Sequence, residues 1–220
     1  MTDDTKKPSM VFVDGIDGTG KTTLLASLTT KIAALDPERP VLQLRLPEDV
    51  GRADYRTIIK KGPRTPVDAA QASAYAMEDA LLNVACFIRV MDDARRFLAD
   101  NPTGIILCDR SLETINCYQN DLFKNPVYSS AMGLLRDELF RGMTLSWTFV
   151  LKPPEEFIVS NLTSGRAGDD DVIDALIAKK ATEYRDLYRD SGRFTRIMTL
   201  RNPDSYLDDV INVLTHQSVL

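Results

Sequence analysis

Histidine and cysteine, the residues that most often hold transition metals or carry nucleophilic chemistry, are scarce in this chain. Its 220 residues include one histidine, His216, and three cysteines whose spacing matches no metal site. We therefore expect neither zinc chemistry nor Ser-His-Asp chemistry. Cys86, Cys108 and Cys117 lie in apolar segments, and we interpret them as reduced core residues of a cytoplasmic protein.

Long apolar runs and an excess of positive charge are also missing. No run reaches the length of a membrane span, and the N-terminus lacks a signal-peptide core, so we expect no membrane partner and a short disordered tail at residues 1–8. The formal net charge of -5 makes nucleic acid an unfavoured partner. The length and the 44% hydrophobic content suit a single domain, residues 1–220, with a full core.

The most informative segment that is present joins a short apolar run, Met10–Val13, to the sequence GIDGTGKTT at Gly15–Thr23. An apolar strand, a G-x-x-x-x-G-K-[ST] loop and a following helix form the context of a P-loop. Its glycines let backbone N–H groups surround phosphate oxygens, and the helix N-terminus adds a favourable field. The residues expected to bind ATP are Gly15, Asp17, Gly18, Thr19, Gly20, Lys21, Thr22 and Thr23.

Apolar segments and helical patterns alternate along the rest of the chain. Strands are expected at Met10–Val13, Val41–Leu46, Ile105–Cys108, Leu145–Leu151 and Phe194–Leu200. Helices are expected at Thr22–Ala34, in two segments between Thr65 and Leu98, and at Leu112–Gln119, Pro126–Phe140, Glu155–Thr163, Val172–Arg189 and Asp204–Leu214. This alternation predicts an α/β fold of the P-loop NTPase type, with a five-stranded parallel sheet and helices on both faces. Its chemistry should lie at the carboxyl ends of the strands.

An acidic residue, Asp109, directly follows the apolar strand expected at Ile105–Cys108. This is the Walker B arrangement, in which the carboxylate holds Mg²⁺ directly or through water. Together with the Thr22 hydroxyl, Asp109 is the expected metal ligand. The adjacent Arg110 carries a guanidinium that matches phosphate oxygens. The alternative is an Asp–Arg pair that only closes the strand.

Several motifs together resemble the thymidylate kinase family of nucleoside monophosphate kinases, in the family's order and over nearly the whole chain. They are the P-loop at Gly15–Thr23 preceded by Asp14, RLPE at Arg45–Glu48, Arg89 in a long helix, DRSLETINCYQ at Asp109–Gln119, and Pro154-Glu155 followed by Ser164-Gly165-Arg166. The resemblance implies ATP as phosphoryl donor, Mg²⁺ as cofactor, a deoxynucleoside monophosphate (dTMP first) as acceptor, and a homodimer working in nucleotide biosynthesis.

Roles for individual residues follow from the same resemblance. Asp17 would hold the acceptor sugar 3′-OH, Arg45 and Arg89 the acceptor phosphate, and Tyr118 the face of the sugar. The implied substrate-binding set is Asp17, Arg45, Pro47, Arg89, Asn116, Tyr118 and Gln119. Arg89 could instead form a surface ion pair on its helix, and Tyr118 could belong to the core.

A lid over the site is expected at about residues 161–171, and Arg166 is the only arginine between the fourth strand and the long helix that follows. Because Gly18 leaves no basic side chain on that part of the P-loop, an arginine from the lid would supply charge from the other side. The implied catalytic set is Lys21, Arg110, Arg166 and Asp17. A solvated loop arginine is the alternative for Arg166.

The chain departs from the family pattern mainly around the base. Ala85 stands where the family has an aromatic platform, and Ile115 stands where some members have an asparagine that reads the base. Ser111 replaces an aromatic residue or histidine after Asp-Arg, and Ser160 and Ser164 occupy lid positions where arginines are usual. These changes predict a larger, less thymine-specific pocket and leave the reaction class intact.

Three other functions remain open. A deoxynucleoside kinase shares the P-loop and an acidic-Arg-Ser motif, and in it an acidic residue acts as base toward a sugar 5′-OH. A more distant relative could phosphorylate a modified base or a nucleic-acid end. A non-catalytic P-loop protein would bind nucleotide as a switch or scaffold, although Lys21, Thr22, Asp109 and Arg110 together favour catalysis.

Overall fold

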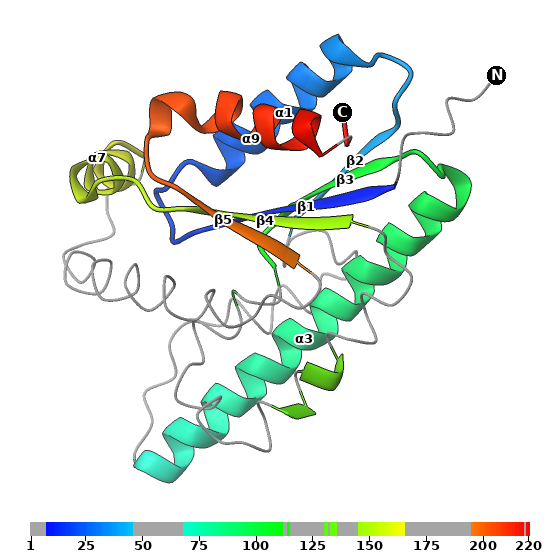
Figure 1. Ribbon diagram of the computed structural model, residues 1–220. Helices are drawn as coiled ribbons and strands as arrows, with labels where there is room; N and C mark the ends of the chain where they lie inside the picture. The colour runs from blue at the N-terminus through cyan, green and yellow to red at the C-terminus, as the bar shows by residue number, and fades with distance from the viewer. Residues whose placement is uncertain are drawn as a thin grey trace.

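A single parallel sheet forms the centre of the molecule (Figure 1). The computed structural model describes residues 8–45, 68–111, 114, 130–131, 133–135, 145–165, 195–217 and 219–220. Within them the strands are β1 (Ser9–Asp14), β2 (Val41–Arg45), β3 (Ile105–Asp109), β4 (Leu145–Leu151) and β5 (Thr195–Leu200). Their order is β2-β3-β1-β4-β5, and every neighbouring pair is parallel. The predicted five-stranded parallel sheet is confirmed.

The central strand, β1, is buried along its whole length. Its side chains alternate between two cores, with Met10 and Phe12 on one face and Val11 and Val13 on the other. Burial on both faces explains why β1 reads as a continuous apolar run. In the register, Val13 is opposite Asp109 of β3, and Asp109 is opposite Arg45 of β2, so these three strands end at one level.

Helices α1 (Lys21–Leu35) and α9 (Tyr206–His216) cover one face of the sheet (Figure 1). Leu25, Leu28 and Ile32 recur at helical spacing along α1 and are fully buried against the strands. Val210 and Leu214 of α9 join the same core. The last helix was expected at Asp204–Leu214. In the structure a 3₁₀ turn, η1 (Pro203–Ser205), comes first, because the Asn202 side chain accepts a hydrogen bond from the Asp204 N–H.

The opposite face is covered by α3 (Ala69–Asp100), which begins after the N-cap Asp68. The prediction of two helical segments here was wrong for the described residues, since α3 is one continuous helix of 32 residues. No glycine or proline interrupts its sequence. The predicted N-terminal signal, Thr65-Pro66, lies outside the described residues. Phe87 stacks on Phe12 with 6.3 Å between ring centroids, joining α3 to β1.

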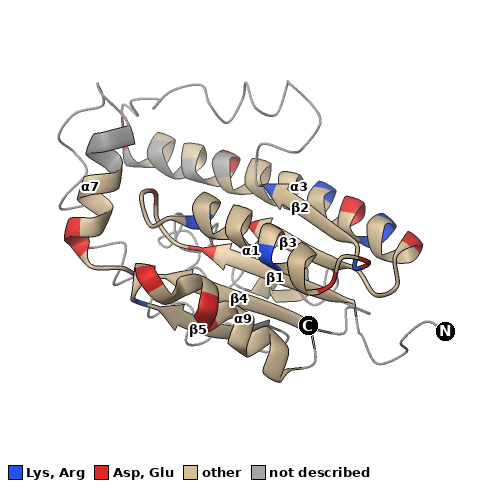
Figure 2. Cartoon of the chain, turned by 90° about the horizontal axis from the view of Figure 1, so that it is seen from above, with Lys and Arg blue, Asp and Glu red and all other residues tan. Residues whose placement is uncertain are grey.

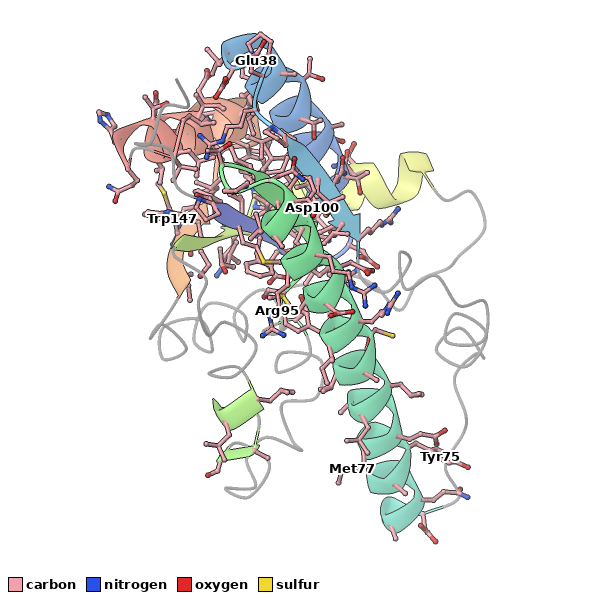
Figure 3. All side chains as sticks on the ribbon, turned by 90° about the vertical axis from the view of Figure 1, so that its right-hand side faces the viewer. Glu38, Tyr75, Met77, Arg95, Asp100 and Trp147 are labelled. Carbon is pink, nitrogen blue, oxygen red and sulfur yellow. The ribbon has the colours of Figure 1, made fainter. Side chains whose placement is uncertain are left out.

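Only part of α3 lies beneath the sheet. Figures 1 and 3 both show its N-terminal turns extending past the strands, whereas its C-terminal end lies beside them. Tyr75 and Met77 are labelled on the N-terminal turns in Figure 3, and Asp100 at the other end. Gly104 allows this placement of the C-terminal end, because a Cβ there would lie 2.7 Å from the Phe97 ring. Figure 2 shows positively and negatively charged residues interspersed along the C-terminal half of the helix.

Helix α7 (Glu155–Gly165) follows β4. It is two residues longer than the predicted Glu155–Thr163 and ends on a glycine, so residues 161–165 of the predicted lid are helical. Glu155 and Glu156 in its first turn complement the positive end of the helix. The helix predicted at 172–189 and most of those at 112–119 and 126–140 lie outside the described residues. None of the described helices is long and apolar enough to cross a membrane.

Candidate active site

The P-loop connects the end of β1 to the start of α1 through three glycines with positive φ. Gly15, Gly18 and Gly20 have φ of 145°, 83° and 93°. Gly15 is also sterically confined, since a Cβ there would lie 2.9 Å from the Leu151 carbonyl oxygen and 2.8 Å from Thr19 Oγ1. Gly20 is the N-cap of α1, so the helix N-terminus opens directly onto the loop.

Lys21, the first residue of α1, folds back over the loop. Its Nζ donates hydrogen bonds to the carbonyl oxygens of Gly15 and Ile16, both at 2.8 Å, and lies 3.8 Å from Asp17 Oδ1. The pKa of Lys21 is lowered to about 8, chiefly by burial and also by the positive charge of Arg110, against the opposing effect of nearby carboxylates. The site therefore holds a desolvated cation that an anionic ligand would stabilise.

Arg110 leaves the end of β3 in an unusual backbone conformation. Its φ of 77° is the only positive value among the described non-glycine residues. For an L-residue this region costs about 1–2 kcal/mol. The Arg110 N–H donates to the Val13 carbonyl oxygen at 2.9 Å, and its guanidinium donates to Asp17 Oδ1 at 2.7 Å. The turn thus carries the guanidinium from the end of β3 back to the P-loop.

Asp14, the last residue of β1, lies beneath this turn and is fully buried. One of its carboxylate oxygens accepts a hydrogen bond from Ser111 Oγ, and the other accepts one from Thr114 Oγ1. Both hydroxyl residues are themselves buried. The carboxylate is therefore satisfied by two side chains from the segment that follows Arg110.

Asp109 is buried beside Arg45, whose Nε lies 3.5 Å from Asp109 Oδ2. Burial raises the pKa of Asp109, while the charges of Lys21, Arg110 and Arg45 oppose the rise. Its Oδ1 is buried without a hydrogen-bond partner. An orphaned carboxylate oxygen at the end of a strand fits the need of Mg²⁺ for a hard oxygen ligand, and the exposed Thr22 at the start of α1 supplies a hydroxyl.

No group of three His, Cys, Asp or Glu side chains able to hold a metal occurs in the part of the chain that the structure describes. A protein-only metal cage is not needed for Mg²⁺, which proteins usually bind through one or two side chains together with substrate phosphates.

Helix α7 contacts the P-loop from outside. Asn161 Nδ2 donates to the Gly18 carbonyl oxygen at 2.8 Å, across 143 positions of sequence. The nearest atom to a Cβ built on Gly20 would be Phe157 Cε1, at 3.9 Å. The helix that begins the predicted lid region is thus anchored to the loop expected to bind phosphates.

The structure brings together five residues that sequence analysis expected in one site. Contacts or electrostatic interactions connect Asp17, Lys21, Arg45, Asp109 and Arg110. Thr22 and Thr23 are exposed at the adjoining helix start. The remaining substrate and lid residues, Pro47, Asn116, Tyr118, Gln119 and Arg166, lie outside the described residues.

Arg89, the other arginine expected at the acceptor phosphate, lies on α3. It is half exposed on α3 and pairs with Asp92 and Asp93 of the same helix, each at 3.6 Å. These are the spacings of ordinary surface ion pairs on a helix, which was the alternative interpretation of Arg89.

Two features of the site were missed from sequence. The first is the pair of contacts that Asp14 makes with Ser111 and Thr114. The sequence holds only a weak indication of them: two hydroxyl residues, three positions apart, follow the Asp-Arg pair at the end of β3, the strand beside β1. The second is the hydrogen bond from Asn161 to Gly18, which the sequence does not indicate, because no local pattern shows where α7 packs.

The strand order, the P-loop after β1 and the acidic end of the neighbouring β3 define an α/β protein of the P-loop NTPase fold. No family model matches the chain, and no curated protein does. Among solved structures the chain is similar to the thymidylate kinase from Ehrlichia chaffeensis, with 16% identity and a TM-score of 0.63. The match covers 94% of this chain and 99% of that one. At this identity the similarity shows a shared fold.

Proposed function

We propose that this protein transfers a phosphoryl group from ATP to a deoxynucleoside monophosphate, with dTMP as the first acceptor to test. The observation that carries the proposal is the contact chain Lys21–Asp17–Arg110 beside the pair Arg45–Asp109. It places three cations at the carboxyl ends of β1, β2 and β3, around a P-loop. Phosphoryl transfer requires this concentration of positive charge in a partly desolvated site.

The donor phosphates would occupy the P-loop. Lys21 would exchange the Gly15 and Ile16 carbonyl oxygens for phosphate oxygens, which satisfy its charge better than neutral acceptors do. Arg110 would share its guanidinium between Asp17 and the transferred group. Thr22 and Asp109 would hold Mg²⁺, which neutralises phosphate charge when bound.

The acceptor side is supported by Arg45. Its side chain is half exposed and reaches Asp109 from β2, so it can bind a phosphate entering beside the metal ligand. Asp17 would accept a hydrogen bond from the sugar 3′-OH, as the family resemblance implies. In line with the family resemblance, the enzyme would work as a homodimer, and Arg166 would complete the site from the lid.

A nucleoside kinase is the second candidate, and the contacts of Asp14 and Arg45 disfavour it. A base toward a sugar 5′-OH needs a carboxylate oxygen able to accept that proton. Both oxygens of Asp14 already accept hydroxyl hydrogen bonds in a fully buried position, so Asp14 is unsuited to that role. Arg45 beside Asp109 further favours an acceptor that brings its own phosphate.

The base pocket is proposed to be relaxed. Ala85 of α3 is partly buried and offers a methyl group where an aromatic platform would contribute about 1–3 kcal/mol of stacking. Several monophosphates, or a 5-substituted deoxyuridine monophosphate, should then be accepted beside dTMP. Strict selectivity for dTMP would refute the relaxed pocket and leave the kinase proposal standing.

The test is a coupled assay with ATP, Mg²⁺ and a panel of nucleosides and nucleoside monophosphates, with Lys21→Ala as the control. We expect the protein to phosphorylate monophosphates only. Lys21→Ala should reduce the rate about 10²–10³-fold. Phosphorylation of nucleosides alone would support the second candidate. ATP binding without any transfer would support a non-catalytic P-loop protein.

A further inference from the structure

Asp14 is a fully buried carboxylate to which the proposed reaction assigns no task. It ends β1 and directly precedes Gly15, whose carbonyl oxygen accepts a hydrogen bond from Lys21. Its two oxygens receive hydroxyl hydrogen bonds from Ser111 and Thr114, which follow Arg110 in the chain. We call Asp14, Ser111 and Thr114 the Asp14 clamp.

We propose that the Asp14 clamp positions Arg110, holding its backbone in the left-handed region so that the guanidinium points at Asp17 and the P-loop. The inference rests on the proposed function, because it assumes that Arg110 acts on the transferred phosphoryl group. Asp14, Ser111 and Thr114 are positioning residues that act through Arg110.

The backbone around Arg110 shows why such a clamp is needed. Arg110 is held on both sides, by its own N–H bond to Val13 and by the Ser111 hydroxyl bond to Asp14. The Thr114 N–H also donates to the Ser111 carbonyl oxygen at 3.1 Å. An arginine at φ 77° persists only where its surroundings impose that conformation. These bonds supply that constraint.

The contacts of Asp14 also distinguish the positioning of Arg110 from a role as general base or metal ligand. A general base or metal ligand presents an oxygen to its ligand, whereas both Asp14 oxygens face hydroxyl donors in a buried site. An asparagine could keep both contacts, since a hydroxyl can accept from the amide NH₂ as well as donate to the amide oxygen. Hydroxyl contact, rather than carboxylate charge, should therefore be the property that matters.

The experiment compares Thr114→Val, which keeps shape and loses the hydroxyl, with Thr114→Ser, which keeps the hydroxyl. We expect Thr114→Val to lower kcat at least about tenfold with a KM for ATP within about twofold of wild type, and Thr114→Ser to retain wild-type kcat. In an Arg110→Ala background, Thr114→Val should have little further effect. Equal losses in both backgrounds would show a general structural role and overturn the proposal.

Asp14→Asn distinguishes positioning from chemistry. It should keep kcat within about tenfold of wild type, whereas loss beyond about 10³-fold in a folded variant would identify Asp14 as a base or metal ligand and overturn the clamp. Where Thr114→Val does not fold, Ser111→Ala with Ser111→Thr as its control replaces it.

A readout without catalysis separates failure of the clamp from failure of the proposed function. The Arg110 Nε–H resonance, assigned by its loss in Arg110→Ala, should be sharp in the wild type and in Thr114→Ser, and exchange-broadened in Thr114→Val. An unchanged resonance would overturn the clamp even if the enzyme is active. A broadened resonance in a protein that phosphorylates no monophosphate would uphold the clamp and refute the kinase proposal.

Discussion

Lys21 carries its charge where water is almost excluded, with only 7% of the side chain exposed. Two carbonyl oxygens replace part of its hydration, but they are neutral, and the carboxylate of Asp17 is 3.8 Å away. The charged form is therefore destabilised relative to the unfolded chain. Because its charge is poorly solvated, Lys21 is stabilised by an incoming phosphate more than an exposed lysine would be.

Stability should rise with pH as Lys21 titrates. Its pKa is about 8 in the folded protein against the ordinary 10.5, so between these values the unfolded chain binds more protons and folding becomes more favourable as pH increases. Relative to Lys21→Met, which cannot titrate, the wild type should gain about 2 kcal/mol of unfolding free energy between about pH 7 and about pH 9.5. Urea unfolding at both pH values measures it. Parallel pH dependence in the two proteins would refute a lowered pKa.

At the scale of elements, the P-loop glycines divide into two kinds. Gly15 combines φ 145° with close approach to the Leu151 carbonyl oxygen, whereas Gly20 has φ 93° and only a van der Waals neighbour, Phe157. Gly15→Ala should lower Tm much more than Gly20→Ala, whose cost is mainly the backbone term of about 1–2 kcal/mol. Thermal unfolding of both variants compares them. A Gly20→Ala protein at least as unstable as Gly15→Ala would contradict this ranking.

An exposed hydrogen bond from Asn161 to Gly18 connects α7 to the P-loop. Removing it with Asn161→Ala should cost about 0.5–1.5 kcal/mol and act locally. Hydrogen exchange of the α7 amides should quicken severalfold, while amides of β1 stay protected. Glu156→Asp, an exposed substitution that keeps the first-turn charge of the same helix, serves as the control. If the two variants exchange alike, the contact does not hold α7 in place.

At the scale of the whole molecule, two cores on opposite faces of one sheet support the site. Leu214 of α9 is fully buried against α1 and the strands, while its neighbour Thr215 is exposed. Leu214→Ala should lower the unfolding free energy by about 2–5 kcal/mol and Thr215→Ala by much less, without changing the KM of the folded enzyme. Denaturant unfolding and initial rates check both parts. A normal stability for Leu214→Ala would mean that α9 is not part of the cooperative core.

The local elements were predictable because their signals are local. Burial on both faces made β1 and β3 mainly apolar runs, and the glycines before Lys21 marked the loop and the helix start. The sequence predicted two helical segments where α3 is one continuous helix, in keeping with the lack of glycine and proline between Ala69 and Asp100. For Arg89 the structure shows ion pairs within its own helix, and its role toward an acceptor phosphate stays a prediction.

The sequence by itself determined the fold class, the phosphate loop and the strand ends at which charged residues gather, because periodicity and glycine placement act over a few neighbouring residues. Only the tertiary structure decided how those charges are paired. Arg110 meets Asp17, Arg45 meets Asp109, and Ser111 and Thr114 share Asp14. Each contact joins residues more than 60 positions apart and depends on strand register and on one left-handed residue, which no local pattern encodes.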